Sequence, residues 1–208
     1  MAAAKKKVVI RKSPIILVSS TVYGIEPLLD QVFGQLRAYG YTVWMSRRGT
    51  IQLSHGKSAF GSCLQAVDQC DMFLGIITGR YGSGVNSTGL SITHREINRA
   101  IRNNRPRWFL VEHDVAVARQ VLKSVRFNAK GNVRKCFCYK KSAVLDDYRI
   151  IEMYEKAMRL DIALERRKDN WVQEFPSHEF VRDFIDAQFS DVSRIRNMLA
   201  EKAKRRNN

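Results

Sequence analysis

Short apolar runs recur along the chain, and each is bounded by residues that favour turns. Nearly continuous runs of this kind are typical of strands buried on both faces of a sheet. The run from Met72 to Ile77 is the clearest, because it follows Asp71 and ends in a loop rich in Gly, Ser and Asn. The strands predicted in this way are residues 14–18, 41–44, 72–77 and 108–111.

Between these strands, apolar residues recur at helical spacing. In the first such segment Leu28, Val32 and Leu36 share one face, and Gly40 follows as a stop signal. The helices predicted in this way are residues 25–39, 58–69, 93–103 and 115–125. Strands that alternate with helices imply a mostly parallel sheet with helices on both faces. The predicted fold class is therefore α/β.

The pattern is less regular beyond Val111. Residues 136–139 are predicted to form an edge strand that completes a sheet of about five strands, and Trp171 and Phe175 are placed in a connector. Long amphipathic helices are predicted over residues 144–168 and 177–204. The predicted organisation is a basic leader (1–13), an α/β domain (14–141) and a C-terminal helical extension packed on that domain (142–208).

The chain is strongly basic, with 36 Lys and Arg against 20 Asp and Glu and a net charge of +16. A field of this sign attracts polyanions, nucleotides and anionic surfaces. The charge makes nucleic-acid binding an alternative function. It is not the leading one, because no recognition helix, zinc finger or aromatic RNA-binding signature is visible in the sequence. The basic residues that prompt it are Arg126, Lys130, Arg134, Lys135, Lys140 and Lys141.

Cysteine and histidine usage does not predict a metal site. Cys63, Cys70, Cys136 and Cys138 have neither a zinc-ligand spacing nor the density of a disulfide-rich secreted protein. We interpret them as reduced thiols in a cytoplasmic protein. No apolar segment is long enough for a signal peptide or a membrane span, so no membrane association is expected.

Polar residues follow two of the predicted strands at their carboxyl ends, where ligands bind in open α/β sheets. Ser19, Ser20 and Thr21 follow the first strand; they are candidates for phosphate or ribose contacts, or for capping the next helix. The loop after the central strand contains Gly79, Arg80, Tyr81, Gly82 and Ser83. Arginine can grip phosphate and tyrosine can stack on a base, although packing within the loop explains both equally well.

Glu96 is the only carboxylate near this loop in the sequence, at the start of the helix predicted over 93–103. The tetrapeptide from Thr93 to Glu96 is also a capping box, in which Thr93 is the N-cap and Glu96 folds back onto the backbone. Both interpretations remain open from the sequence.

Four blocks resemble, in order and spacing, the family known as domain of unknown function 4062, over about residues 14–111. They are ILVSST at 16–21, DQCDMF at 68–73, GRYGS at 79–83 and SITHRE at 91–96. That family is similar to Toll/interleukin-1-receptor-like (TIR-like) domains and to nucleoside deoxyribosyltransferases. Both have flavodoxin-like sheets in which a Glu attends cleavage or transfer at an N-glycosidic bond.

The resemblance implies a TIR-like nucleotide N-glycosidase that cleaves NAD or a related nucleotide, with Glu96 as the catalytic residue and no cofactor or metal. It also implies a role in immune or anti-phage defence. The implied substrate contacts are Ser19, Ser20, Thr21, Arg80, Tyr81, Gly82, Ser83 and Thr93. The alternative is a non-catalytic TIR-like module that senses a nucleotide, or that assembles with copies of itself or with a partner protein.

Overall fold

The computed structural model describes residues 13–85, 87, 89–134 and 137–207, so the predicted basic leader lies almost wholly outside the described residues. Its centre is a five-stranded sheet in the order β2-β1-β3-β4-β5, with every neighbouring pair parallel. The strands are β1 (Ile15–Ser20), β2 (Thr42–Trp44), β3 (Met72–Ile77), β4 (Arg107–Glu112) and β5 (Asn170–Phe175). This order is that of a flavodoxin-like α/β fold, which confirms the predicted fold class.

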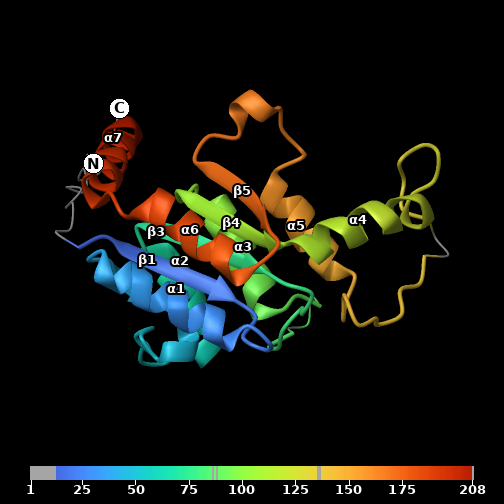
Figure 1. Ribbon diagram of the computed structural model, residues 1–208, viewed down its shortest axis with the longest axis horizontal. Coiled ribbons are helices and arrows are strands. Elements are labelled where there is room, and N and C mark those ends of the chain that lie inside the picture. The colour runs from blue at the N-terminus through green and yellow to red at the C-terminus, as the bar shows by residue number, and fades with distance from the viewer. Residues whose placement is uncertain (1–12, 86, 88, 135–136, 208) are drawn as a thin grey trace, which may run out of the picture.

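Helices cover both faces of the sheet. The helices on one face are α1 (Glu26–Ala38), α6 (His178–Phe189) and α7 (Val192–Asn207). Those on the other are α2 (Ala59–Gln69), α3 (Ile92–Arg102), α4 (His113–Arg126) and α5 (Arg149–Met158). Two short 3-10 helices, η1 (Ser46–Arg48) and η2 (Leu164–Arg166), lie in loops. Figure 1 shows α4 extending away from the sheet, at the opposite end of the molecule from α7.

The central strand β3 is buried along its whole length. Phe73 and Ile77 belong to the core on the α3 side of the sheet, whereas Leu74 and Ile76 belong to the core on the α1 side. Gly75 has no side chain because a Cβ atom there would lie 2.7 Å from the ring of Phe109 on β4. The nearly continuous apolar run therefore reflects burial on both faces, as predicted.

The predicted edge strand at 136–139 is wrong for residues 137–139, which are not in a strand; Cys136 lies outside the described residues. The edge strand is β5 instead, in the stretch predicted as a connector. Its signal was weak because Trp171 and Gln173 are exposed at the sheet edge. Trp171 stacks on Trp108 of β4 with ring centroids 4.7 Å apart, a contact that only the folded sheet creates.

The long C-terminal helices are shorter than predicted. The helix expected over 144–168 is α5 alone, because Arg159 adopts a left-handed conformation (φ 54°) that ends it. The helix expected over 177–204 breaks into α6 and α7, and the carboxylate of Asp191 accepts a hydrogen bond from the backbone N–H of Arg194 at 2.9 Å. Residues 142–208 therefore contribute a strand and core helices to the sheet as well as an outer helix.

None of the described helices combines the length and the apolar character needed to cross a bilayer.

Candidate functional site

The sheet topology singles out one place at its carboxyl edge. The chain leaves β1 toward β2 on one side, and β3 lies on the other side of β1, so the order of the strands reverses between β1 and β3. In open α/β sheets, ligands bind in the crevice at this switch point. The carboxyl end of β1 carries Ser19 and Ser20, and α3 begins beyond the loop that follows β3.

Glu96 lies in the second turn of α3 and points to the end of β1. Its Oε2 atom accepts a hydrogen bond from the Ser19 hydroxyl at 2.5 Å, and the residue is only 6% exposed. Burial raises the pKa of Glu96 to about 7, while the Ser19 hydrogen bond and the charge of Arg95 act in the opposite direction. Within the described residues no cation forms an ion pair with this carboxyl group. Near neutral pH, both the neutral and the charged form of Glu96 are therefore populated.

The capping-box alternative for Glu96 is wrong. The N-cap of α3 is Ser91, whose hydroxyl accepts from the backbone N–H of His94 at 3.3 Å. Thr93 lies inside the first turn and is buried. Helix α3 starts earlier than predicted, which moves Glu96 beyond the position that can fold back onto the cap. The serine itself was the sequence signal for this start, because Ser is among the preferred N-cap residues.

The loops after β1 and β3 are in contact. Gly82 has φ +85°, and a Cβ atom there would lie 2.8 Å from Oγ1 of Thr21, so only glycine allows this approach. The carbonyl of the neighbouring Ser83 accepts from the backbone N–H of Ile92 at 3.2 Å, which ties the loop to the start of α3. The folded chain thus brings most of the predicted substrate contacts to one edge.

Tyr81 is engaged within the protein. Its hydroxyl lies 2.9 Å from Nδ1 of His94 and accepts from the backbone N–H of Ser91 at 3.3 Å. Burial, followed by the charge of Arg149, lowers the pKa of His94 to about 4, so the ring is neutral and its Nδ1 can accept the tyrosine proton. In this arrangement the ring of Tyr81 is 3% exposed, and its role in stacking on a base stays a prediction.

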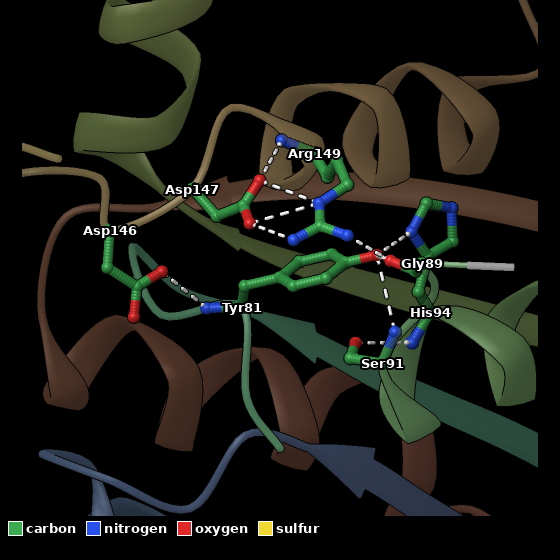
Figure 2. A network of polar contacts seen from close by, with 7 residues as sticks. All are labelled: Tyr81, Gly89, Ser91, His94, Asp146, Asp147 and Arg149. Carbon is green, nitrogen blue, oxygen red and sulfur yellow. Dashed lines mark hydrogen bonds and ion pairs between the residues drawn. The ribbon is translucent and has the colours of Figure 1, made fainter. Parts of the chain in front are cut away.

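Arg149, at the start of α5, clasps this loop, as Figure 2 shows. Its guanidinium lies 4.5 Å from the centroid of the Tyr81 ring, donates to the carbonyl of Gly89 and pairs with Asp147. Asp146 accepts from the backbone N–H of Tyr81 at 2.8 Å. Two adjacent acids and an arginine, all far along the chain, therefore hold both ends of the loop. Sequence reasoning missed them because no local pattern marks them.

The segment before α5 packs tightly on the same loop. A Cβ atom on Gly79 would lie 1.9 Å from the carbonyl oxygen of Val144, and the backbone N–H of Asp146 donates to the carbonyl of Gly79 at 3.0 Å. The N–H of Gly79 donates to Glu112 at the end of β4, also at 3.0 Å. Gly79 therefore serves close packing. For Arg80, no hydrogen bond or ion pair of the guanidinium is seen in the described part of the chain, and its side chain is half-buried.

Most of the predicted site residues are buried. Ser19, Thr21, Thr93 and Glu96 are each at most 6% exposed, whereas Ser20 is half-buried and Ser83 is exposed. Burial also raises the pKa of Cys63 to about 11, with a smaller effect of the neighbouring Glu96, so this thiol stays protonated. Among the residues that the structure describes, no three or more His, Cys, Asp or Glu side chains gather as they would around a metal ion.

The remaining block of the resemblance, DQCDMF at 68–73, serves structure at the opposite edge. Asp68 accepts from Nε and Nη2 of Arg99 at 2.6 and 2.5 Å and from Asn103 at 2.7 Å, which pins α3 to the end of α2. Asp71 accepts from the backbone N–H of Ile15 at 2.8 Å and so ties the start of β3 to the start of β1. These contacts fix the register that places Ser19 beside Glu96.

The fold and the position of Glu96 define a flavodoxin-like α/β protein with a buried acid at its switch point. The sequence matches the family described as Domain of unknown function (DUF4062) over residues 15–169, and the protein belongs to this family. A solved structure of a 2-deoxyribosyltransferase from the psychrotolerant bacterium Bacillus psychrosaccharolyticus is similar at 22% sequence identity and a TM-score of 0.33. That similarity covers 47% of this chain and 72% of the transferase. A comparison with curated proteins finds no match.

Proposed function

We propose that this protein is a nucleotide N-glycosidase that acts on NAD or a related nucleotide, with Glu96 as the reacting carboxylate. The observation that carries the proposal is the buried carboxyl group of Glu96 at the switch point of the sheet, which has a hydrogen bond from Ser19 but no ion-pair partner among the described residues. Burying such a group costs free energy that an apolar residue would not cost. Strongly perturbed acids in a predicted ligand crevice are candidates for chemistry.

The reaction needs few groups. Hydrolysis of NAD breaks the bond between the anomeric carbon of the nicotinamide ribose and the pyridinium nitrogen, and water supplies the new carbon–oxygen bond. The products are nicotinamide, ADP-ribose and one proton. Positive charge develops on the ribose as the base leaves, and a carboxylate stabilises such a transition state. Glu96 supplies this carboxylate in its ionised form, and the Ser19 hydroxyl orients it.

Because Glu96 is only 6% exposed, we assign the access of a ligand to a movement of the loop that follows β3. The contacts that hold this loop are those of Arg149, Asp146 and Gly79 described above. The proposal therefore includes an opening step before substrate binds. Arg80, whose guanidinium is not engaged by the described residues, is the cation on this loop that we assign to the substrate's phosphates.

The test is to incubate the protein with NAD and with nucleoside monophosphates and to measure release of the free base by chromatography. Glu96→Gln keeps the volume and the Ser19 hydrogen bond but cannot carry charge, so base release is expected to fall at least about 100-fold. Glu112→Gln is the matched control, because it removes another carboxylate from the same edge of the sheet. Equal turnover by wild type and Glu96→Gln contradicts the role of Glu96.

A non-catalytic module that binds a nucleotide is the second candidate, and the burial of Glu96 against Ser19 favours it. Ser19 and Glu96 satisfy each other's hydrogen bonds without a ligand, as a resting or structural pair would. This candidate predicts that NAD or a monophosphate raises the melting temperature of the protein without being consumed. Self-association on ligand addition, measured by light scattering, would support assembly as the output.

A further inference from the structure

A groove of about 930 Å³ lies away from the candidate site, along the outer half of α4. Its walls come from α4, from the turn after it and from α5, with Leu160 just beyond. Figure 1 shows that α4 and this turn project from the body of the molecule. Nothing in the proposed glycosidase function uses it.

A large part of the net positive charge lies in this segment of the chain. Residues 113–141 contain eight Lys and Arg against the single acid Asp114, whereas residues 142–208 contain equal numbers of basic and acidic residues. The excess charge is therefore not spread evenly, as it would be if it served solubility alone.

The carboxylate in the groove is already neutralised. Glu155 pairs with Arg119 at 3.2 Å and with Arg126 at 2.9 Å. By contrast, Lys123 and Lys130 are exposed, and neither forms an ion pair within the described residues. Lys123 lines the groove, and Lys130 lies in the turn between the lining residues Ala129 and Gly131. These two lysines therefore present uncompensated charge to a ligand.

Arg134 and Phe127 add a fixed cation and an aromatic ring. Nε of Arg134 donates to the carbonyl of Phe127 at 2.9 Å, and its Nη2 donates to the carbonyl of Ser124 at 3.4 Å, which holds the guanidinium at the groove. Phe127 is half-buried and lines the groove, with the guanidinium of Arg126 4.8 Å from its ring centroid. Cations along a groove with an aromatic platform are the pattern that binds single-stranded nucleic acid.

We propose that this groove binds single-stranded nucleic acid, with phosphates at Lys123, Lys130 and Arg134 and one base on Phe127. The concave shape favours a chain of phosphates over a flat membrane surface. The backbone phosphates of RNA and DNA supply the same chemistry, and the experiment distinguishes them. This site is independent of Glu96 and of the proposed glycosidase.

The experiment measures fluorescence anisotropy of labelled oligouridylate and oligothymidylate of about 20 nucleotides, enough to fill a site of this class. The full chain is titrated at several salt concentrations, beside a duplex and vesicles of phosphatidylserine. The double variant K123A/K130A is compared with R102A/R166A, which removes two exposed cations outside the groove and changes net charge equally. The first pair is expected to lose about tenfold in affinity and to reduce the salt slope by roughly 1.4, the effect of two phosphate contacts.

The control pair is expected to change affinity less than about threefold. Phe127→Leu keeps an apolar side chain and is expected to weaken binding about fivefold or more, because a stacking partner is lost. A ratio of the affinities for the two oligonucleotides identifies the natural strand. Equal losses in the two double variants, tighter binding to duplex or vesicles, or no binding at low salt would each overturn the proposal.

Discussion

Glu96 is neutral over a wider pH range in the folded protein than in the unfolded chain, because burial raises its pKa from 4.5 to about 7. Between these values the unfolded chain releases a proton that the folded protein keeps. The stability that this proton confers is therefore complete below pH 4.5 and is lost as the pH rises through about 7. Ionisation of Glu96 near neutral pH therefore lowers the stability of the fold, and a role in function would explain why a carboxyl group is buried at this position.

Glu96→Gln is expected to remove this pH dependence. Relative to wild type, the variant should gain on the order of 2 kcal/mol of unfolding free energy between pH 5 and pH 8, since the amide does not ionise. Urea denaturation at several pH values measures the difference. Glu112→Gln, at the half-buried end of β4, provides the comparison. A constant difference between Glu96→Gln and wild type across this range would mean that Glu96 ionises normally.

Ionisation of Glu96 lowers stability but is expected to raise activity. The proposed mechanism uses the charged form of Glu96, so base release should rise as the pH increases from about 6 to 8 and then level off. The pH profile of turnover by wild type measures this. A rate that falls through pH 7 would indicate that the protonated acid is the active form.

At the scale of elements, Arg149 connects the start of α5 to two described points of the loop after β3, because it contacts Tyr81, Gly89 and Asp147 at once. Arg149→Ala should therefore release the loop. Amide hydrogen exchange in residues 81–92 is expected to rise at least about tenfold, and the melting temperature to fall by a few degrees. Arg182→Ala is the control, since the ion pair that Arg182 forms among the described residues is with the exposed Asp183.

If the proposed opening step limits substrate access, Arg149→Ala should also increase the rate of NAD turnover relative to wild type. Unchanged exchange in 81–92 would show that Arg149 does not hold the loop, whatever the activity.

The contact between α2 and α3 depends on Asp68 in a similar way. Asp68→Asn leaves Arg99 without its carboxylate and should lower the unfolding free energy by roughly 1–2 kcal/mol, a value discounted because both side chains are about a third exposed. Urea denaturation measures it, with Asp183→Asn as an exposed control that should change stability by less than about 0.5 kcal/mol. Equal effects would show that the Asp68 pair is only a surface contact.

At the scale of the molecule, β5 and α6 complete the sheet and one of its two cores. A chain that ends after Asp169 should lose cooperative unfolding, because β4 becomes an unpaired edge and Phe175, Ile185 and Phe189 are removed from the core. A chain that ends after Ser190 keeps both elements and should unfold cooperatively, with reduced stability. Near-ultraviolet circular dichroism during urea titration distinguishes them. Cooperative unfolding of the shorter chain would instead support a separate domain over 14–141.

Prediction from sequence succeeded where the pattern was local. The strands and helices up to Arg126 were predicted at nearly their observed positions, because burial on one or two faces leaves a periodic record in a short segment. It failed at β5, where the alternation of apolar and polar residues is weak because the strand lies at the exposed edge of the sheet. It also misplaced the start of α3, whose N-cap Ser91 precedes the first apolar residue of the helix.

The sequence by itself determined the α/β alternation, the family and the polar loops that meet at one edge of the sheet. Only the tertiary structure decided that Glu96 meets Ser19, 77 residues away, and that Arg149 closes the loop at Gly89, 60 residues away. The reason is physical: periodicity records how a segment is buried, whereas a pKa and a hydrogen-bond partner depend on which distant segments complete that burial.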